Sequence, residues 1–263
     1  AESSFKSDKV DSYILATFLR MNFIPKAYAP SPQIRVVKDI IRHRLFLVKE
    51  ITKVKNRLSL LLLKEGYFED KIKDDIKDRT WSIFSEHGKK ILMEKLPLWS
   101  KEHQWMWKDS VELLKDLESR KAMIEKHFYD TWEDNDPVIK RLMSIPGIGL
   151  ISAITLRYEV DDINRFQNSR KFVRYCGLCP TTHSSDLKIF NGKTVKSCNK
   201  YLKTMFIECT LGGMRGSVEL KEFYNKLKIT RKPNIAKVAL AKKICELVYH
   251  IWKGGHEFDK KYL

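Results

Sequence analysis

A polar segment in the second half of the chain carries the residues best suited to nucleophilic chemistry. Ser185 follows His183 by two positions and directly precedes Asp186, and Lys193 and Lys196 come shortly after. A neighbouring base can activate a serine hydroxyl, and nearby cations would stabilise a pentavalent phosphorus intermediate. By composition alone a polar loop without chemistry is the simpler interpretation, so Ser185 is a candidate nucleophile.

Two carboxylates near the start of the chain are spaced for a metal ion. Asp8 and Asp11 stand three residues apart, which places them on one face of a helix and within reach of one cation. Acids in a first helical turn also stabilise the helix dipole, by about 0.3–1 kcal/mol, and need no other purpose. Two carboxylates alone fall short of a two-metal centre for phosphoryl transfer.

The spacing of cysteine and histidine leaves a zinc site open. Cys176 and Cys179 form a Cys-x2-Cys pair, and His183 and Cys198 follow, so four ligands of the types that zinc prefers lie close in sequence. A single close pair is weak evidence, and free structural thiols explain the same residues. The odd total of five cysteines favours a reduced protein over a disulfide framework.

A turn with two glycines is a candidate phosphate clamp. In the run Ile145-Pro146-Gly147-Ile148-Gly149 the glycines permit a tight turn and a close backbone approach, and the N–H groups that start the next helix can bind an anion. The pattern resembles a helix-hairpin-helix, which would bind DNA without reading its sequence. The alternative is an ordinary helical corner.

Two long helices are expected to position these groups, over residues 32–65 and 101–128. Apolar residues recur in each at alternating steps of three and four, which is typical of a coiled-coil seam. The two helices could pair as an antiparallel hairpin or assemble between chains. The outer faces of the first helix carry the basic residues Arg35, Lys38, Arg42, Lys49, Lys53 and Arg57. The last four are the candidates for contact with a nucleic-acid backbone.

The rest of the chain divides into shorter elements. Proline, glycine and asparagine positions predict one helix from Ser7 to about residue 22, short helices within 66–100, and a loop before each long segment. The expected elements after residue 136 are helices over 138–144, 150–158 and 234–252, and a hairpin that turns at Asn191-Gly192 between short strands. The predicted domains are residues 1–25, 26–135 and 136–263.

Composition limits the class of protein. Helix formers dominate the 263 residues, with only 11 Gly and 8 Pro, so a mainly α fold is expected. The 50 Lys and Arg exceed the 33 Asp and Glu, giving a formal net charge of +17. Such a surplus favours a polyanion partner, nucleic acid before an anionic membrane, although a solvated basic surface is the alternative. No apolar run approaches the ~20 residues of a membrane span, and no signal peptide is visible.

The order of these motifs resembles a known family. The matching residues lie mainly between Leu142 and Leu202, with further similarity at residues 7–12, 49–62 and 236–252. The matching runs are Leu142-Met143-Ser144-Ile145-Pro146-Gly147-Ile148-Gly149, Ala153, Arg165-Phe166, Tyr175-Cys176-Gly177-Leu178-Cys179-Pro180, Ser185, Gly192-Lys193-Thr194-Val195-Lys196, Asn199 and Leu202. The series is similar to the C-terminal domain of insertion-sequence transposases of the "one-ten" and "eleven-eleven" groups, to whose superfamily the pilin-gene inverting recombinase belongs.

The resemblance implies a DNA recombinase that uses two active centres. Its members carry an RNase H-like (RuvC-like) domain with a DEDD metal site, and the third and fourth acids of that set fall on Asp8 and Asp11. Their C-terminal domain carries a catalytic serine thought to attack a DNA phosphate, and it falls on Ser185. We therefore expect Mg²⁺ at Asp8 and Asp11, and a remnant of an RNase H-like fold around them.

The resemblance also implies partners. Members bind DNA, form multimers through a coiled coil, and in many cases carry a structured guide RNA, whose backbone would suit Arg42, Lys49, Lys53 and Arg57. The expected DNA-binding residues are Pro146, Gly147, Ile148, Gly149, Lys193, Lys196 and Asn199. No membrane association is expected, and the predicted location is the cytoplasm of a prokaryote, at the nucleoid.

Three departures qualify this expectation. The first Asp and the Glu of the DEDD set have no counterpart in the sequence, which begins at Ala1, so we expect an N-terminally truncated protein with an incomplete metal site. Asp186 replaces a usual Gly and would repel an incoming phosphate unless a cation offsets it. Cys198 also replaces a common Gly. The alternative to a recombinase is therefore a non-catalytic nucleic-acid-binding module left by a truncated element.

Overall fold

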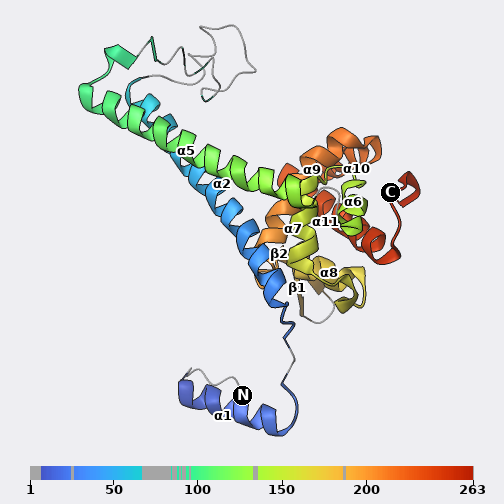
Figure 1. Cartoon of the computed structure of the whole chain (residues 1–263). Helices are drawn as coiled ribbons and strands as arrows, with labels where there is room; N and C mark the ends of the chain where they lie inside the picture. Colours follow the sequence, from blue (N-terminus) through green and yellow to red (C-terminus); the bar gives the residue numbers. More distant parts are fainter. Residues whose placement is uncertain are drawn as a thin grey trace.

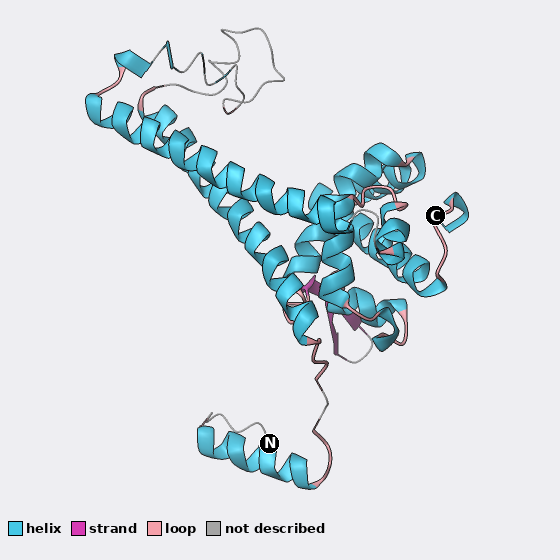
Figure 2. Ribbon diagram, in the orientation of Figure 1, coloured by secondary structure: helices cyan, strands magenta, loops and turns pink. Residues whose placement is uncertain are grey.

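A computed structural model describes residues 7–24, 27–66, 84, 88, 90, 93, 94, 96–132, 136–185 and 188–262, with residues 182–185, 188–191, 193 and 262 described by their backbone alone. The described chain is mainly helical, as the composition predicts. Two long helices lie side by side and project from a compact helical body, and the first helix stands apart near the N-terminus (Figures 1 and 2).

Helix α1 spans Asp8–Arg20 and begins where the sequence predicts it. The Ser7 side chain accepts a hydrogen bond from the Val10 backbone N–H at 3.4 Å, which satisfies one of the free donors of the first turn. Asn22, with φ of 54°, ends the segment in the left-handed region. The helix contains no buried residue, so its apolar side chains have no partner within the described chain.

Helices α2 (Pro32–Lys64) and α5 (Lys101–Trp132) form the long antiparallel pair. Pro32 suits the first turn of α2 after the Ser31 cap, and Gly66, with φ of 78°, follows its end. The predicted seam is the buried face: Ile41 and Leu58 of α2 and Leu114 of α5 are each 1% exposed. The predicted bounds of both helices are confirmed to within a few residues.

Ion pairs between α2 and α5 define the antiparallel register. Arg44 donates twice to Glu125, at 2.9 and 2.6 Å, and Lys55 lies 2.8 Å from Glu118. Arg44 and Lys55 occupy positions in the three-and-four spacing of the predicted apolar seam, and acids on α5 match both of them. Of the two arrangements left open by the sequence, the structure contains the hairpin within one chain. Supercoiling of the pair and association between chains stay predictions.

The body after residue 136 is built from short helices around a long one. Asp136 caps α6 and Pro137 occupies its first turn, as expected of a helix start. The elements are α6 (Pro137–Met143), α7 (Leu150–Val160), η2 (Ile163–Arg165), α8 (Ser169–Tyr175), α9 (Lys200–Gly216), α10 (Val218–Thr230), α11 (Pro233–Gly254) and η3 (Lys260–Tyr262). Helix α11 packs against α6, α8, α9 and α10, so its apolar sequence forms the centre of the core.

The base of the long hairpin is part of the same core. Ile41 of α2 and Phe128 of α5 are fully buried in one cluster with the side chains of α7, α9 and α11. A second, smaller cluster lies further along the hairpin, around Leu58, Trp99 and Trp107. The packing thus continues across residue 135, and the three-domain division remains a prediction. Most of residues 66–100, where short helices were expected, lies outside the described residues, apart from η1 (Leu96–Leu98).

Strands β1 (Pro180–Ser185) and β2 (Lys188–Thr194) form an antiparallel hairpin, but the predicted turn is wrong. Asn191 pairs with Thr182 inside the ladder, so Asn191-Gly192 lies within β2. Between this pair and the next, Pro180 with Thr194, β2 holds one residue more than β1, which is a β-bulge. A glycine that signals a two-residue turn also suits a bulge, and sequence alone does not separate these uses.

Candidate nucleic-acid interface

The turn between α6 and α7 uses its two glycines differently. Gly147 has φ of +91°, and a Cβ there would overlap the backbone N of Gly213 and the backbone O of Cys209. The absence of a side chain at Gly147 therefore permits the turn to pack closely against the backbone of α9. Gly149 is exposed, and a Cβ there would meet nothing within 4 Å. Only the Gly149 side of the turn leaves room for a ligand.

The first turn of α7 carries backbone donors that the helix itself cannot use. Gly149 is the N-cap, it has no side chain to cap with, and Ala153 is the first residue whose N–H bonds back to the Gly149 carbonyl. The backbone N–H groups of residues 150–152 lie at the positive end of the helix dipole, where an anion would be stabilised. Ile148 is buried and Pro146 is half-buried, so neither offers an apolar surface of much extent.

A buried carboxylate joins the long hairpin to the body. The side chain of Glu159, on α7, is 1% exposed, and Arg42 of α2 donates to it twice, at 2.9 and 3.1 Å. Asn199 donates a third hydrogen bond to it at 2.9 Å. This hydrogen bonding raises the pKa of Arg42, so the guanidinium stays charged and the carboxylate keeps a partner.

Asn199 has a second structural task. Its Oδ1 accepts from the backbone N–H groups of Tyr201 and Leu202, at 3.0 and 3.1 Å, and so caps α9. Its amide nitrogen also donates to the Tyr175 hydroxyl at 3.3 Å. Every polar atom of this side chain is therefore engaged within the protein, and its predicted contact with DNA stays a prediction.

Lys38 lies one turn before Arg42 and is 8% exposed. The pKa of Lys38 is lowered overall, because the effect of burial exceeds the opposing effect of the nearby negative charge of Glu159. A lysine held in this position adds a second cation beside the carboxylate. The expectation that Lys38 lies on the outer face of α2 is wrong, because this face packs against the body beside Glu159 of α7. No sequence pattern indicated Glu159, because its partners lie far away along the chain.

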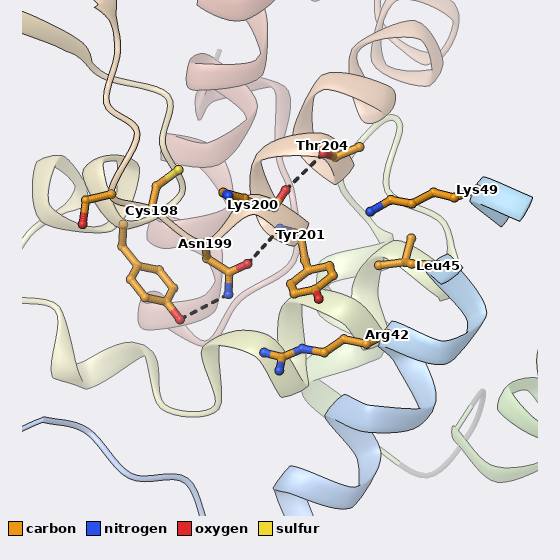
Figure 3. Close-up of a pocket in the computed structure, with 10 residues that line it drawn as sticks. Arg42, Leu45, Lys49, Cys198, Asn199, Lys200, Tyr201 and Thr204 are labelled. Atoms are coloured by element: carbon orange, nitrogen blue, oxygen red, sulfur yellow. Dashed lines mark hydrogen bonds between the residues drawn. The ribbon is translucent and has the colours of Figure 1, made fainter. Parts of the chain in front are cut away.

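A pocket opens between α2 and the start of α9 (Figure 3). Its volume is about 620 Å³, and its cationic lining comes from Arg42, Lys49 and Lys200. Tyr201 lies beside Arg42, whose guanidinium carbon is 4.8 Å from the ring centroid. Lys49 and Lys200 are both exposed, and within the described part of the chain neither has an acidic partner.

The segment between α1 and α2 is fastened to the body by Tyr28. Its hydroxyl donates to Asp161, and its ring lies 4.4 Å from the guanidinium carbon of Arg165. Arg165 also lies over the rings of Phe166 and Tyr175, each at 4.6 Å. The hydrogen bond to Asp161 raises the pKa of Tyr28 to about 12. No sequence pattern indicated this contact.

The predicted catalytic groups occupy separate regions. Asp8 and Asp11 lie together in the exposed first turn of α1. Ser185 is the last residue of β1, paired with Lys188, and Lys196 is exposed beyond the end of β2. Asp186 and the side chains of Ser185, His183 and Lys193 lie outside what the structure describes. Lys53 is exposed and pairs with Glu50 at 2.7 Å, and Arg57 is exposed on the same helix.

The residues present only partly fit the expected metals. Among the described residues, no group of three or more His, Cys, Asp or Glu is arranged to hold an ion. Asp8 and Asp11 could give two carboxylate ligands, and Mg²⁺ takes six oxygen ligands. Cys176 is buried, and burial raises the pKa of its partly buried neighbour Cys179. The side chain of His183 lies outside the described residues, so zinc binding by this set stays untested. No described helix is long and apolar enough to cross a membrane.

Comparisons with known proteins agree with the motif order. Residues 139–225 match the family described as "Transposase IS116/IS110/IS902 family", and residues 1–67 match a DEDD transposase family of the IS110 type. The first match contains the α6–α7 turn, Ser185 and Asn199, and the second contains Asp8, Asp11 and α2.

Curated relatives point the same way. The chain is 32% identical over 114 residues to the transposase of insertion sequence IS1111A from Coxiella burnetii, covering 42% of this chain and 31% of the relative. It is 27% identical over 152 residues to the transposase of IS1328 from Yersinia enterocolitica, covering 56% of this chain and 44% of the relative. The chain spans less than half the length of the curated relatives it matches. The two family matches, at residues 1–67 and 139–225, together cover more than half of the chain and are both of IS110-type transposases, so the chain belongs to the IS110 family of insertion-sequence transposases.

Proposed function

We propose that the protein acts in DNA transposition, by binding DNA and cutting and rejoining strands through the hydroxyl of Ser185. The observation that carries the proposal is the match of residues 139–225 to the transposase family, which includes this serine. The position of Ser185 at the end of a strand supports it, because a residue at a hairpin end can approach an extended duplex more freely than one inside a core.

The proposed reaction conserves phosphodiester bonds. The Ser185 Oγ attacks a DNA phosphorus, a serine–phosphodiester bond forms, and the bond to the leaving 3′ or 5′ oxygen breaks, with a proton delivered to that oxygen. A second DNA hydroxyl then reverses the step and releases the serine. Lys193 and Lys196 lie towards the Pro180 end of the hairpin, so they would bind DNA beside the serine rather than offset charge at the reacting phosphate.

A divalent metal ion is part of the proposal, because the family model at residues 1–67 is that of a DEDD transposase. Mg²⁺ is the ion we expect, Asp8 and Asp11 would hold it, and it would polarise a phosphate oxygen or a water. Since two carboxylates do not complete its ligand set, we derive no step through it. We further propose that α1 belongs to an RNase H-like fold, a placement supported by the same match.

Partners follow from surface charge. We propose that DNA approaches the start of α7 at Gly149 and the lysines beyond β2, and that a structured guide RNA lies along the exposed basic face of α2 at Lys49, Lys53 and Arg57. Self-association through the long hairpin is also proposed. It would use outer faces, since the inner seam is covered by α5. Such a protein would work at the nucleoid in the cytoplasm.

The test is a covalent adduct. The protein is incubated with Mg²⁺ and a DNA that carries the ends of its insertion sequence, and the mixture is separated under denaturing conditions. We expect a serine–DNA adduct in the wild type, none in Ser185→Ala, and an undiminished amount in the neighbouring Ser184→Ala. An adduct at the wild-type level in Ser185→Ala would refute the role of Ser185.

A non-catalytic binding module is the second candidate. It is favoured by one observation, that Asp8 and Asp11 are exposed and have no third ligand among the described residues. That module would bind DNA with an affinity that falls steeply with salt, as counterion release requires, and would form no adduct under any metal condition. Adduct formation therefore separates the two functions.

A further inference from the structure

The pocket between α2 and α9 is the strongest unassigned feature of the described chain. Two of its lysines, Lys49 and Lys200, come from different elements and lie on either side of one opening (Figure 3). Lys49 belongs to the middle of α2, and Lys200 is the first residue of α9. Packing of α2 against the body therefore creates a cationic opening that neither helix has alone.

The three cationic side chains of this pocket differ in whether an acidic side chain pairs with them. Arg42 is held by the buried Glu159, so its charge is largely matched inside the protein. The ammonium groups of Lys49 and Lys200 have no such acid among the described residues, and no acidic side chain lines the pocket. The 17-residue helix α9 also begins here, and its positive dipole end adds to the field. The pocket is therefore suited to an anion.

The rest of the lining combines apolar and aromatic side chains with the polar Ser197, Asn199 and Thr204. Leu45 and Tyr201 form part of the wall, and Tyr175, which contacts both Asn199 and Arg165, lines the pocket as well. A free inorganic anion needs no aromatic wall, whereas a nucleotide combines a phosphate with a planar base. A base that is paired and stacked in a duplex cannot enter a recess, but a base in a single strand can.

We propose that this pocket holds one nucleotide of a single-stranded nucleic acid, its phosphate between Lys49 and Lys200 and its base against Leu45 and Tyr201. The proposal rests on the nucleic-acid function proposed above and adds a site to it. The site is separate from the proposed nucleophile. Pro180 and Thr194 pair at the end of the hairpin that leads into the pocket residues Ser197 and Cys198, and Ser185 stands at the other end, roughly 16 Å along the strand from Pro180. The pocket would hold a strand while chemistry occurs elsewhere.

Binding of labelled oligonucleotides tests the proposal. Fluorescence anisotropy would compare single-stranded DNA, single-stranded RNA and a duplex of equal length, for the full chain and for Lys49→Ala/Lys200→Ala. The matched control is Lys226→Ala/Lys228→Ala, which removes the same charge from exposed positions of α10 outside the pocket. Circular dichroism and thermal melting would confirm that both double variants are folded.

The expected result is a loss that depends on the strand. The pocket variant should bind single strands about five- to tenfold more weakly, with a salt slope reduced by about 0.7 per lost phosphate contact. It should keep its affinity for duplex DNA, because duplex DNA is proposed to bind at Gly149 and the lysines beyond β2. The control should lose little in either. Whichever of DNA or RNA shows the larger loss identifies the source of the strand. Equal losses in both double variants, or an equal loss for duplex and single strand, would overturn the proposal.

A second readout reports occupancy directly. Cys198 lines the pocket, and Cys179, also partly exposed, does not. Bound single strand should slow alkylation of Cys198 and leave that of Cys179 unchanged, as measured by peptide mass spectrometry. An unchanged rate at Cys198 under saturating oligonucleotide would contradict the site. If the wild type binds no nucleic acid of any kind, the proposed function fails, whereas wild-type binding without protection of Cys198 rejects the pocket alone.

Discussion

Arg42 and Glu159 are 117 residues apart and form the two-point ion pair that attaches α2 to α7. The carboxylate is 1% exposed and the arginine 39%, so the pair lies at the boundary between core and solvent. Removing Arg42 would leave Glu159 with Asn199 and no directly bonded cation, at a cost set by its desolvation.

We therefore expect Arg42→Ala to lower the free energy of unfolding by about 2–3 kcal/mol, below the full cost of a broken buried pair because solvent reaches Arg42. Glu159→Gln should cost less, since a neutral amide can still accept from Arg42. Urea denaturation of both variants checks the order. A larger loss in Glu159→Gln than in Arg42→Ala would contradict the view that the unpaired carboxylate causes the damage.

The antiparallel register of the long hairpin predicts a charge-reversal rescue. Arg44→Glu and Glu125→Arg each place like charges together and should each destabilise the protein by about 1 kcal/mol. The double variant restores an opposite-charge pair and should recover most of that loss. Thermal denaturation of the four proteins gives the coupling energy. Additive losses in the double variant would mean that Arg44 and Glu125 are not neighbours within one chain.

Tyr28 predicts a loss of stability in alkali. Its pKa is raised from 10.0 to about 12 by the hydrogen bond to Asp161, with burial and the charges of Asp161 and Asp162 in the same direction and Arg165 opposed. Because the folded pKa is the higher one, the bond stabilises fully below pH 10 and is lost as pH rises towards 12. The side chain is 45% exposed, so the effect is small.

Urea midpoints measured across that pH range should fall more in the wild type than in Tyr28→Phe, which lacks the ionising hydroxyl. Tyr13→Phe, at a 74% exposed position of α1, is the control and should follow the wild type. Parallel pH profiles in wild type and Tyr28→Phe would show that the contact with Asp161 does not contribute to stability. Tyr28 would then no longer explain how the segment before α2 is held.

The sequence predicts the elements that have local signals. Helices α1, α2, α5, α6, α7 and α11 were expected because caps, prolines and periodic apolar residues mark them. Helices α8, α9 and α10 were not expected. Helix α9, for example, contains Gly212 and Gly213, which read as helix breakers but permit close contact with the α6–α7 turn.

The parts of the candidate site that sequence could not give are the long-range ones. Tyr28 and Asp161 are 133 residues apart, and no spacing rule connects such a pair. The same holds for the pocket, which exists only because α2 packs beside the start of α9. Asn199 was identified through family resemblance as a DNA-binding residue, and its hydrogen bonds to Glu159 and to the α9 backbone give it a structural reason to be present.

Replacing each of the two glycines of the α6–α7 turn by alanine should have very different effects on stability. In Gly147→Ala the new methyl would meet the α9 backbone, which cannot move aside as a side chain can, and the positive φ adds strain. We expect a loss of at least about 3 kcal/mol, and poor folding if the native margin is small. Gly149→Ala has open space, and because alanine is a poorer N-cap than glycine it should lower the free energy of unfolding by about 1 kcal/mol or less.

Gly149→Ala is therefore the variant that tests phosphate binding at the start of α7, because it folds while placing a methyl where a phosphate would approach. If the exposed N–H groups bind DNA, its affinity for duplex DNA should fall about three- to tenfold, with at most a small fall in melting temperature. Filter binding at two salt concentrations measures both affinity and salt slope. Wild-type affinity in a folded Gly149→Ala would show that the turn is a packing corner and that DNA is bound elsewhere on the basic surface.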